Sequence, residues 1–154
     1  MRELWFRGKR KDNGEWVEGE NILIVKTENG KRAYIAQTGT QTAIFESEEH
    51  SDVFVATPAF SRVIPETVGQ YTGLTDRNGT KIFEGDILES EFTKMPYLVC
   101  FGEYTYTDEY GDGQDVCGWY NEDECGYVTA FGCSNGWATV IGNIHDNPEL
   151  LKGE

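Results

Sequence analysis

Apolar and polar positions alternate in short runs along this chain, and Asn-Gly pairs separate several of the runs. Alternation with a period of two predicts strands, and Asn-Gly favours a tight turn because both residues tolerate positive φ. Asn-Gly occurs at residues 13, 29, 78 and 135. The pattern therefore predicts four hairpins, which join Leu4–Arg7 to Trp16–Glu18, Ile22–Lys26 to Arg32–Gln37, Thr72–Leu74 to Ile82–Phe83, and Tyr127–Phe131 to Trp137–Ile141.

Signals for helix are few. Ser47–Asp52 is compatible with a single helical turn, but no apolar stripe with a period of 3.6 residues follows it. Asn147 precedes a proline at the first helical position, which predicts one terminal turn over Asn147–Leu151. Tyr, Phe and Trp together make up 13% of the residues, and aromatic side chains favour strands. The sequence therefore predicts a mainly β protein with little helix.

A length of 154 residues suits one compact domain or two small ones packed together. Ile64-Pro65 ends an apolar run, so we predict an N-terminal β unit over residues 1–65. The remaining residues, 66–154, are predicted to form a small SH3-like β-barrel on which the first unit packs. An acidic insertion over residues 105–126 lacks clear periodicity, and about 20 residues are long for a passive connection. We therefore expect this insertion to be functional or mobile.

Two groups of motifs flank that insertion. The first contains Gln70–Leu74, Asp76–Gly79 and Glu84–Ile87, and the second contains Ile141–Ile144 with Asn147–Leu150. With the opening strand Arg2–Arg7, these motifs resemble the YopX family of phage and prophage proteins. The resemblance implies a phage or prophage accessory protein and supplies no catalytic residue. Turn chemistry alone accounts for Asp76, Asn78, Gly79, Gly85 and Asp86, since Asp and Asn cap turns and Gly relieves steric clashes.

Charge is distributed unevenly over a chain of net charge −14. Residues 1–81 hold 12 acids and 11 bases, whereas residues 82–151 hold 14 acids and the single base Lys94. Such a field attracts basic partners or cations and opposes direct binding to nucleic acid. No apolar run approaches the roughly 20 residues that span a bilayer, and no secretory signal is visible. We expect a protein of the bacterial host cytoplasm that does not bind a membrane.

Acidic and aromatic residues are interleaved in the second half of the chain, and they form the candidate partner-binding set. Its members are Asp108, Glu109, Tyr110, Asp112, Asp115, Trp119, Tyr120, Glu122, Asp123 and Glu124. Acids steer a basic partner and exposed aromatic rings anchor it, so the leading hypothesis is a non-catalytic protein-binding module.

The same features leave alternatives open. They are compatible with an acidic DNA mimic that inhibits a nucleic-acid-binding protein, and with a metal-dependent hydrolase that uses the acidic loop. They also suit a solvated loop that only keeps the protein soluble. Unpaired strand edges allow a homo-oligomer, in which the basic turn Arg7–Lys11 of one copy would pair with the acidic half of another.

Evidence for catalysis is absent from the sequence. His50 and His145 lie far apart, and neither belongs to a recognised catalytic motif. We therefore predict no catalytic residue, no cofactor and no metal site, and a role other than that of an enzyme. The four cysteines lie at residues 100, 117, 125 and 133, a spacing unlike that of zinc sites. Reduced thiols are expected in a cytosol, with Cys100 as a small core residue.

Overall fold

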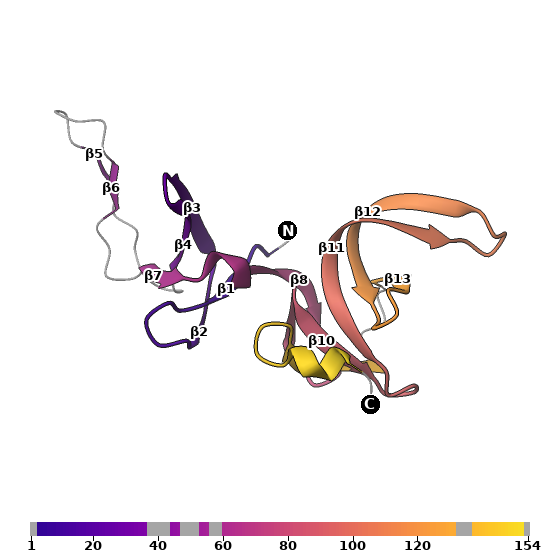
Figure 1. The fold of residues 1–154 in the computed structure, drawn as a ribbon. Coiled ribbons are helices and arrows are strands. Elements are labelled where there is room, and N and C mark those ends of the chain that lie inside the picture. Colours follow the sequence, from indigo (N-terminus) through magenta and orange to yellow (C-terminus); the bar gives the residue numbers. More distant parts are fainter. Residues whose placement is uncertain (1–2, 37–43, 47–52, 56–59, 132–136, 153–154) are drawn as a thin grey trace. The chain divides into compact units, whose positions relative to one another are not determined.

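A computed structural model of the chain describes residues 3–36, 44–46, 53–55, 60–131 and 137–152. The predicted turn at Ser47–Asp52, the fourth Asn-Gly pair, His50 and Cys133 lie outside the described residues. The protein is mainly β, as predicted, and its strands are shown in Figure 1. Those of the first half are β1 (Phe6–Lys9), β2 (Trp16–Gly19), β3 (Asn21–Thr27), β4 (Gly30–Ala36), β5 (Ile44–Glu46), β6 (Val53–Val55), β7 (Phe60–Val63) and β8 (Gly69–Thr75). Those of the second half are β9 (Lys81–Phe83), β10 (Asp86–Ser90), β11 (Pro96–Thr107), β12 (Gly113–Glu122), β13 (Val128–Ala130) and β14 (Ala138–Asn143).

The helical elements in the described part of the chain are short 3₁₀ turns. They include η1 (Pro65–Thr67) and η3 (Pro148–Leu151). The predicted terminal turn is therefore confirmed, although the side chain of Asn147 makes no capping hydrogen bond. In the described part of the chain, no helix has the length and apolar character needed to cross a membrane.

The chain forms two compact units, Glu3–Gln70 and the residues from Tyr71 onward. The division falls inside β8. Its first two residues pair with β1, through Arg7↔Gly69 and Phe6↔Gln70, and its later residues pair with β9. Pro65, where the sequence placed the division, begins η1 two residues after β7 ends at Val63, but the chain keeps its hydrogen bonds to the first unit for a few residues more.

In the first unit, β1 and β2 form one hairpin and β3 and β4 form another, which confirms the first two predicted hairpins. Strand β7 pairs with β4, so that Ala33 lies opposite Val63. The core consists of Val17, Ala33, Ile35 and Val63. Backbones approach closely here, since a Cβ atom on Gly19 would lie 1.8 Å from the carbonyl oxygen of Ala36.

The second unit contains a five-stranded antiparallel sheet in the order β13-β12-β11-β10-β14. The sheet curls into half a barrel (Figure 1), and the SH3-like type stays a prediction. Beside it, β8 and β9 form the third predicted hairpin, which is confirmed. The core of the unit is made of Ile82, Leu88, Val99 and Ala138.

The fourth predicted hairpin is wrong. Strand β13 pairs with β12 at one edge of the sheet, whereas β14 pairs with β10 at the other edge. A turn signal expresses only a local preference. The pairing of β14 with β10 brings fully buried Ala138 into the same core as Leu88, and burial of apolar surface outweighs the local preference.

The acidic insertion is also different from the expected irregular loop. Most of it belongs to the long hairpin of β11 and β12, whose ladder runs from Leu98↔Glu122 to Thr107↔Gly113. On β11 polar residues do alternate with Tyr104 and Tyr106, a strand signal that the sequence-based expectation overlooked. The outer part of β12 is mostly exposed and shows no such alternation.

Candidate functional site

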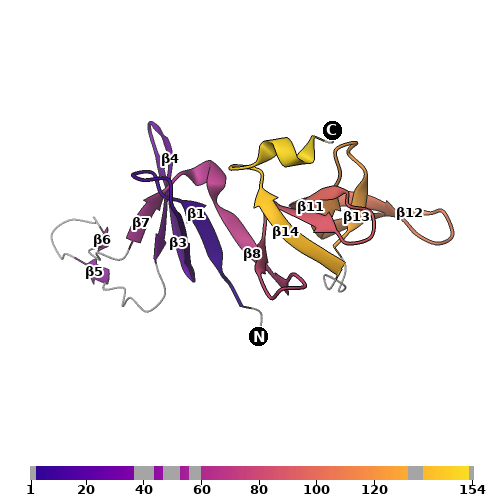
Figure 2. The same cartoon turned by 90° about the horizontal axis from the view of Figure 1, so that it is seen from below.

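The outer part of the β11–β12 hairpin is a two-stranded arm, residues 102–118. Strand β10 pairs with β11 only at residues 96–98, and β13 pairs with β12 only at residues 120–122. Beyond these positions the two strands pair only with each other among the described residues. Figures 1 and 2 show the arm reaching away from the rest of its sheet. Its outer edges therefore present unpaired backbone N–H and C=O groups, which a further strand could join.

Asp108 shapes the turn at the tip of the arm. Its Oδ1 atom accepts hydrogen bonds from the backbone N–H groups of Tyr110 at 2.9 Å and Asp112 at 3.0 Å. Gly111 supplies the positive φ of 87° that the turn requires. The bond from Asp112 is the largest cause that lowers the pKa of Asp108, so the carboxylate stays ionised at neutral pH.

The same turn occurs three times in the second unit. Asp76, Asp108 and Asp123 each accept hydrogen bonds through Oδ1 from the N–H groups two and four residues later. A glycine with positive φ stands three residues after each aspartate. The shared signal, Asp-x-x-Gly, is visible in the sequence at all three positions, although a turn was predicted from it only at Asp76. At the other two positions it would have predicted the ends of β-ribbons.

Exposed aromatic rings and carboxylates share the arm. Tyr110, at the tip, is 85% exposed, and Tyr106 lies exposed on β11. Glu109 and Asp112 flank the tip, and Asp115 follows on β12, where its Oδ1 accepts a hydrogen bond from the Thr105 hydroxyl at 2.6 Å. The arm thus offers negative charge and apolar surface at the same place.

A second surface lies at the base of the arm. There Glu122, Asp123 and Glu124 line a groove of about 510 Å³ whose apolar wall comes from β11 and the C-terminal turn. The other lining residues are Leu98, Ile144, Pro148, Leu151 and Lys152. The acids of this groove are visible in the sequence but its apolar wall is not, because only the tertiary fold brings η3 next to β11.

The structure separates the predicted site residues into two groups. Asp108, Glu109, Tyr110, Asp112 and Asp115 lie at the tip, and Glu122, Asp123 and Glu124 lie at the base. Asp115 and Glu122 are seven positions apart along β12, which corresponds to about 23 Å.

Trp119 and Tyr120 lie between the two groups, on opposite faces of β12. Trp119 packs against the core of the unit, with its ring centroid 4.9 Å from that of Phe101. Its buried Nε1 has no hydrogen-bond partner in the described structure. The ring of Tyr120 stands 5.1 Å from that of Tyr104.

Cys100 is half-buried beside Tyr120 and does not belong to the core cluster, which corrects the sequence-based expectation. Val99 occupies the core, so the next residue on the strand faces the opposite side. Burial, followed by the nearby charges of Glu122 and Glu84, raises the pKa of Cys100 to about 11. The thiol is therefore protonated at neutral pH and is a poor nucleophile.

Few side chains in the described part of the chain are suited to bind a metal ion or to act in acid–base catalysis. There, no group of three or more His, Cys, Asp or Glu side chains is arranged to hold a metal ion. His145 is exposed, and the turn around it is shaped by Asn143, whose Oδ1 accepts hydrogen bonds from the N–H groups of His145 and Asp146, both at 3.0 Å.

The motif residues that flank the acidic insertion stabilise turns and close backbone packing. Asp86 is 1% exposed, and its Oδ2 atom accepts a hydrogen bond from the N–H of Phe83 at 2.8 Å. Gly85 has a φ of 84°. A Cβ atom on Gly142 would lie 2.6 Å from Oδ1 of Asn147, so only glycine lets the C-terminal turn pack on β14.

Comparison with known proteins agrees with this reading of the motifs. Residues 5–152 match the family model described as YopX protein. The chain belongs to the YopX family. Among solved structures, this YopX protein is similar to protein EF1440 from Enterococcus faecalis, known from a crystal structure, with 25% sequence identity and a TM-score of 0.51. The likeness covers 96% of this chain and 97% of that chain. No curated protein matches the chain.

Proposed function

We propose that this YopX protein is a non-catalytic accessory protein of a phage or prophage, and that its β11–β12 arm binds a basic surface of a protein partner. The observation that supports this most directly is the arm itself. It extends beyond its sheet, leaves both outer edges unpaired in the described structure and exposes aromatic side chains. A two-stranded ribbon is only marginally stable in water, so an extension of this length gains stability when a partner covers it.

The negative charge of the arm favours a partner with a positively charged surface. Between residues 101 and 126 the chain has eight carboxylates and no lysine or arginine. Carboxylates at the tip attract a cationic surface from a distance and raise the association rate, whereas exposed rings supply buried area after contact. Tyr110, with its ring almost fully exposed at the tip, is the first anchor to reach the partner.

Neutralisation of the arm tests the proposal. In the variant Glu109→Gln/Asp112→Asn/Asp115→Asn, Asp108 is kept because its carboxylate shapes the turn. A matched control, Glu20→Gln/Glu28→Gln/Glu149→Gln, removes three exposed carboxylates elsewhere. The wild type and the control should capture the same specific protein from bacterial lysate at low salt, and the arm variant should capture much less. Identical capture by all three proteins would contradict the proposal.

Self-association needs a separate measurement, because basic residues of the first unit could dock on the arm of a second copy. Light scattering over a range of protein concentrations, at low and high salt, measures it. A wild-type dimer that the arm variant loses would identify the partner as a second copy of this chain. A monomer under all conditions would leave a different protein as the partner.

A further inference from the structure

The first unit contains a cluster of cations that the proposed function does not use. Lys11, Lys31, Arg32 and Arg62 line one hollow of about 170 Å³. The rest of the lining comes from Val63, Ile64, Pro65 and Glu66, so four cations face a single carboxylate.

The fold holds these cations together. The backbone N–H of Lys11, in the β1–β2 turn, donates a hydrogen bond of 3.0 Å to the carbonyl oxygen of Arg62 on β7. Arg62 on β7 lies opposite Tyr34 on β4, and Arg32 precedes Tyr34 by two residues on β4. Three separate chain segments thus bring positive charge to one place through backbone hydrogen bonds.

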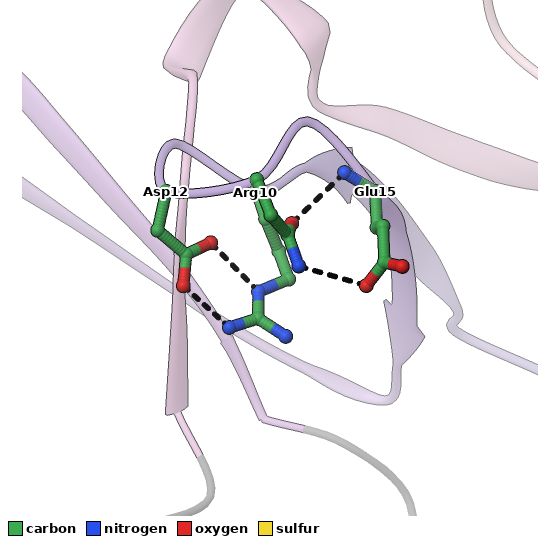
Figure 3. Close-up of polar contacts among 4 residues, drawn as sticks. Arg10, Asp12 and Glu15 are labelled. Carbon is green, nitrogen blue, oxygen red and sulfur yellow. Dashed lines mark hydrogen bonds and ion pairs between the residues drawn. The ribbon is translucent and has the colours of Figure 1, made fainter.

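Nearby acids are already engaged. Figure 3 shows the carboxylate of Asp12 holding the guanidinium of Arg10 through two contacts, with 2.9 Å between Asp12 Oδ1 and Arg10 Nε. Glu15, in the same turn, accepts a hydrogen bond of 2.8 Å from the side-chain amide of Asn13. Neither carboxylate of the turn forms an ion pair with Lys11 in the described structure.

The four cations are left without ion pairs inside the described structure. Other cations of the chain do form ion pairs: Arg10 with Asp12, Arg77 with Glu91 at 2.8 Å, and Lys94 with Glu89 at 3.7 Å. Four like charges around one hollow repel one another, and an anion in the hollow would remove that repulsion. In a chain of net charge −14, such a gathering of unpaired cations indicates a ligand of opposite sign.

We propose that this hollow binds the phosphate group of a small phosphorylated molecule. Arginine presents a planar fork of donors that matches phosphate oxygens, and lysine adds compact positive charge. Val63, which is 1% exposed, belongs with Ile64 and Pro65 to the apolar side of the hollow, where the remainder of a monoester can lie.

Size and charge favour a small ligand over nucleic acid. The hollow accepts one phosphate group, whereas a nucleic acid presents a long row of them. The net charge of −14 repels such a polyanion but has less effect on a single phosphate that reaches the four cations.

Titration of the full-length chain with inorganic phosphate and with phenyl phosphate tests the site, using calorimetry and the melting temperature at constant ionic strength. The wild type should bind both probes saturably and melt at a higher temperature when they are present. Arg32→Gln/Arg62→Gln should weaken binding roughly tenfold or more, because each lost guanidinium removes charge-assisted hydrogen bonds. Lys11→Gln/Lys31→Gln, which changes no arginine, provides a second variant with the same expected loss.

The matched control is Lys94→Gln/Lys152→Gln, which removes two exposed cations of the second unit that do not line the hollow. It should bind phosphate like the wild type. Absence of saturable binding of either probe to the wild type would overturn the proposal, and so would equal weakening in the control. Tighter binding of a short oligothymidylate than of phenyl phosphate, abolished by the arginine substitutions, would overturn the assignment to a small ligand.

Discussion

Asp76 and Val140 stand 64 positions apart in the sequence, and a hydrogen bond of 3.1 Å joins the backbone N–H of Val140 to Oδ2 of Asp76. The other carboxylate oxygen accepts the N–H groups of Asn78 at 2.8 Å and Thr80 at 2.9 Å. One buried carboxylate therefore closes the β8–β9 turn and fastens it to β14. The hydrogen bond fastens the first group of YopX motifs to β14, the strand on which the second group begins.

Asp76→Asn should destabilise the second unit by about 2 kcal/mol, because an amide group can no longer accept hydrogen bonds on both sides. Chemical denaturation at pH 7 measures the loss. Asp12→Asn removes an exposed carboxylate of the first unit and is the control; it should leave the second unit unchanged. An equal effect of the two substitutions would show that Asp76 has no special structural role.

The effect of Asp76→Asn should also depend on pH. Burial by itself raises the pKa of Asp76, but hydrogen bonds from Val140, Thr80 and Asn78 outweigh burial, so the pKa of this carboxyl group is lowered from its ordinary value. A carboxyl group with a lowered folded-state pKa stabilises the fold above its unfolded pKa, and the stabilisation disappears as the pH falls through the folded value. The difference between wild type and variant should thus be constant near neutral pH and shrink below about pH 4. A difference that grows on acidification would contradict the assigned hydrogen bonds.

Gly142→Ala should lower the free energy of unfolding by about 1–3 kcal/mol, because the added methyl group meets Asn147 at 2.6 Å and Leu150 at 2.9 Å. Gly118→Ala is the matched control, since a Cβ atom there meets nothing within 4 Å and its backbone is not in the left-handed region. Urea unfolding of both variants separates steric overlap from a general effect of glycine replacement. Loss of stability in Gly118→Ala but not in Gly142→Ala would contradict the prediction.

The cysteines should differ in reactivity. Cys117 and Cys125 are exposed, whereas Cys100 is half-buried with a pKa of about 11. Iodoacetamide at pH 8 should modify the first two quickly and Cys100 slowly, and the rate at Cys100 should rise as the pH approaches 11, since only the thiolate reacts. Peptide mass mapping reports each position separately. Cys100 reacting as fast as Cys117 at pH 8 would refute the protected environment.

Hydrogen exchange should distinguish the arm from the sheet that carries it. Backbone amides of residues 103–106 are expected to exchange roughly tenfold or more faster than those of 97–99, because the arm has no neighbouring strand on its outer edges and little buried surface. Mass spectrometry after deuteration resolves the two segments. Equal protection in a protein that light scattering shows to be monomeric would mean that the arm is stable without a partner.

Local sequence patterns predicted the fold where turn chemistry decides pairing. The Asn-Gly pairs at residues 13, 29 and 78 each lie between strands that pair with each other. The same signal at 135 failed, because the position of β14 depends on burial of Ala138 against residues far away in the chain. The SH3-like type of barrel stays a prediction, since curvature of a sheet depends on twist and bulges that no short motif records.

Prediction of the candidate site was limited in a similar way. Its acids were visible in the sequence, but their separation into tip and base was not, because it requires the register of β11 against β12. Trp119 was predicted to be a surface anchor, yet it packs on the core because it lies on the same face of the sheet as Val99. The basic hollow was visible only in part, through Lys11, because Arg32 and Arg62 reach it from other strands.

The Asp-x-x-Gly turn at the tip allows the length of the arm to vary among members of the family. At the tip of the arm the turn is closed by its own hydrogen bonds, and each rung below it pairs only within the arm in the described structure. Residues can therefore be gained or lost there without disturbing the core. Removing one residue from a strand would invert its faces, so tolerated changes should come as two residues in each strand, or about 7 Å of reach. Family members should accordingly differ in this region by multiples of four residues, with the same turn at the end of a longer or shorter reach.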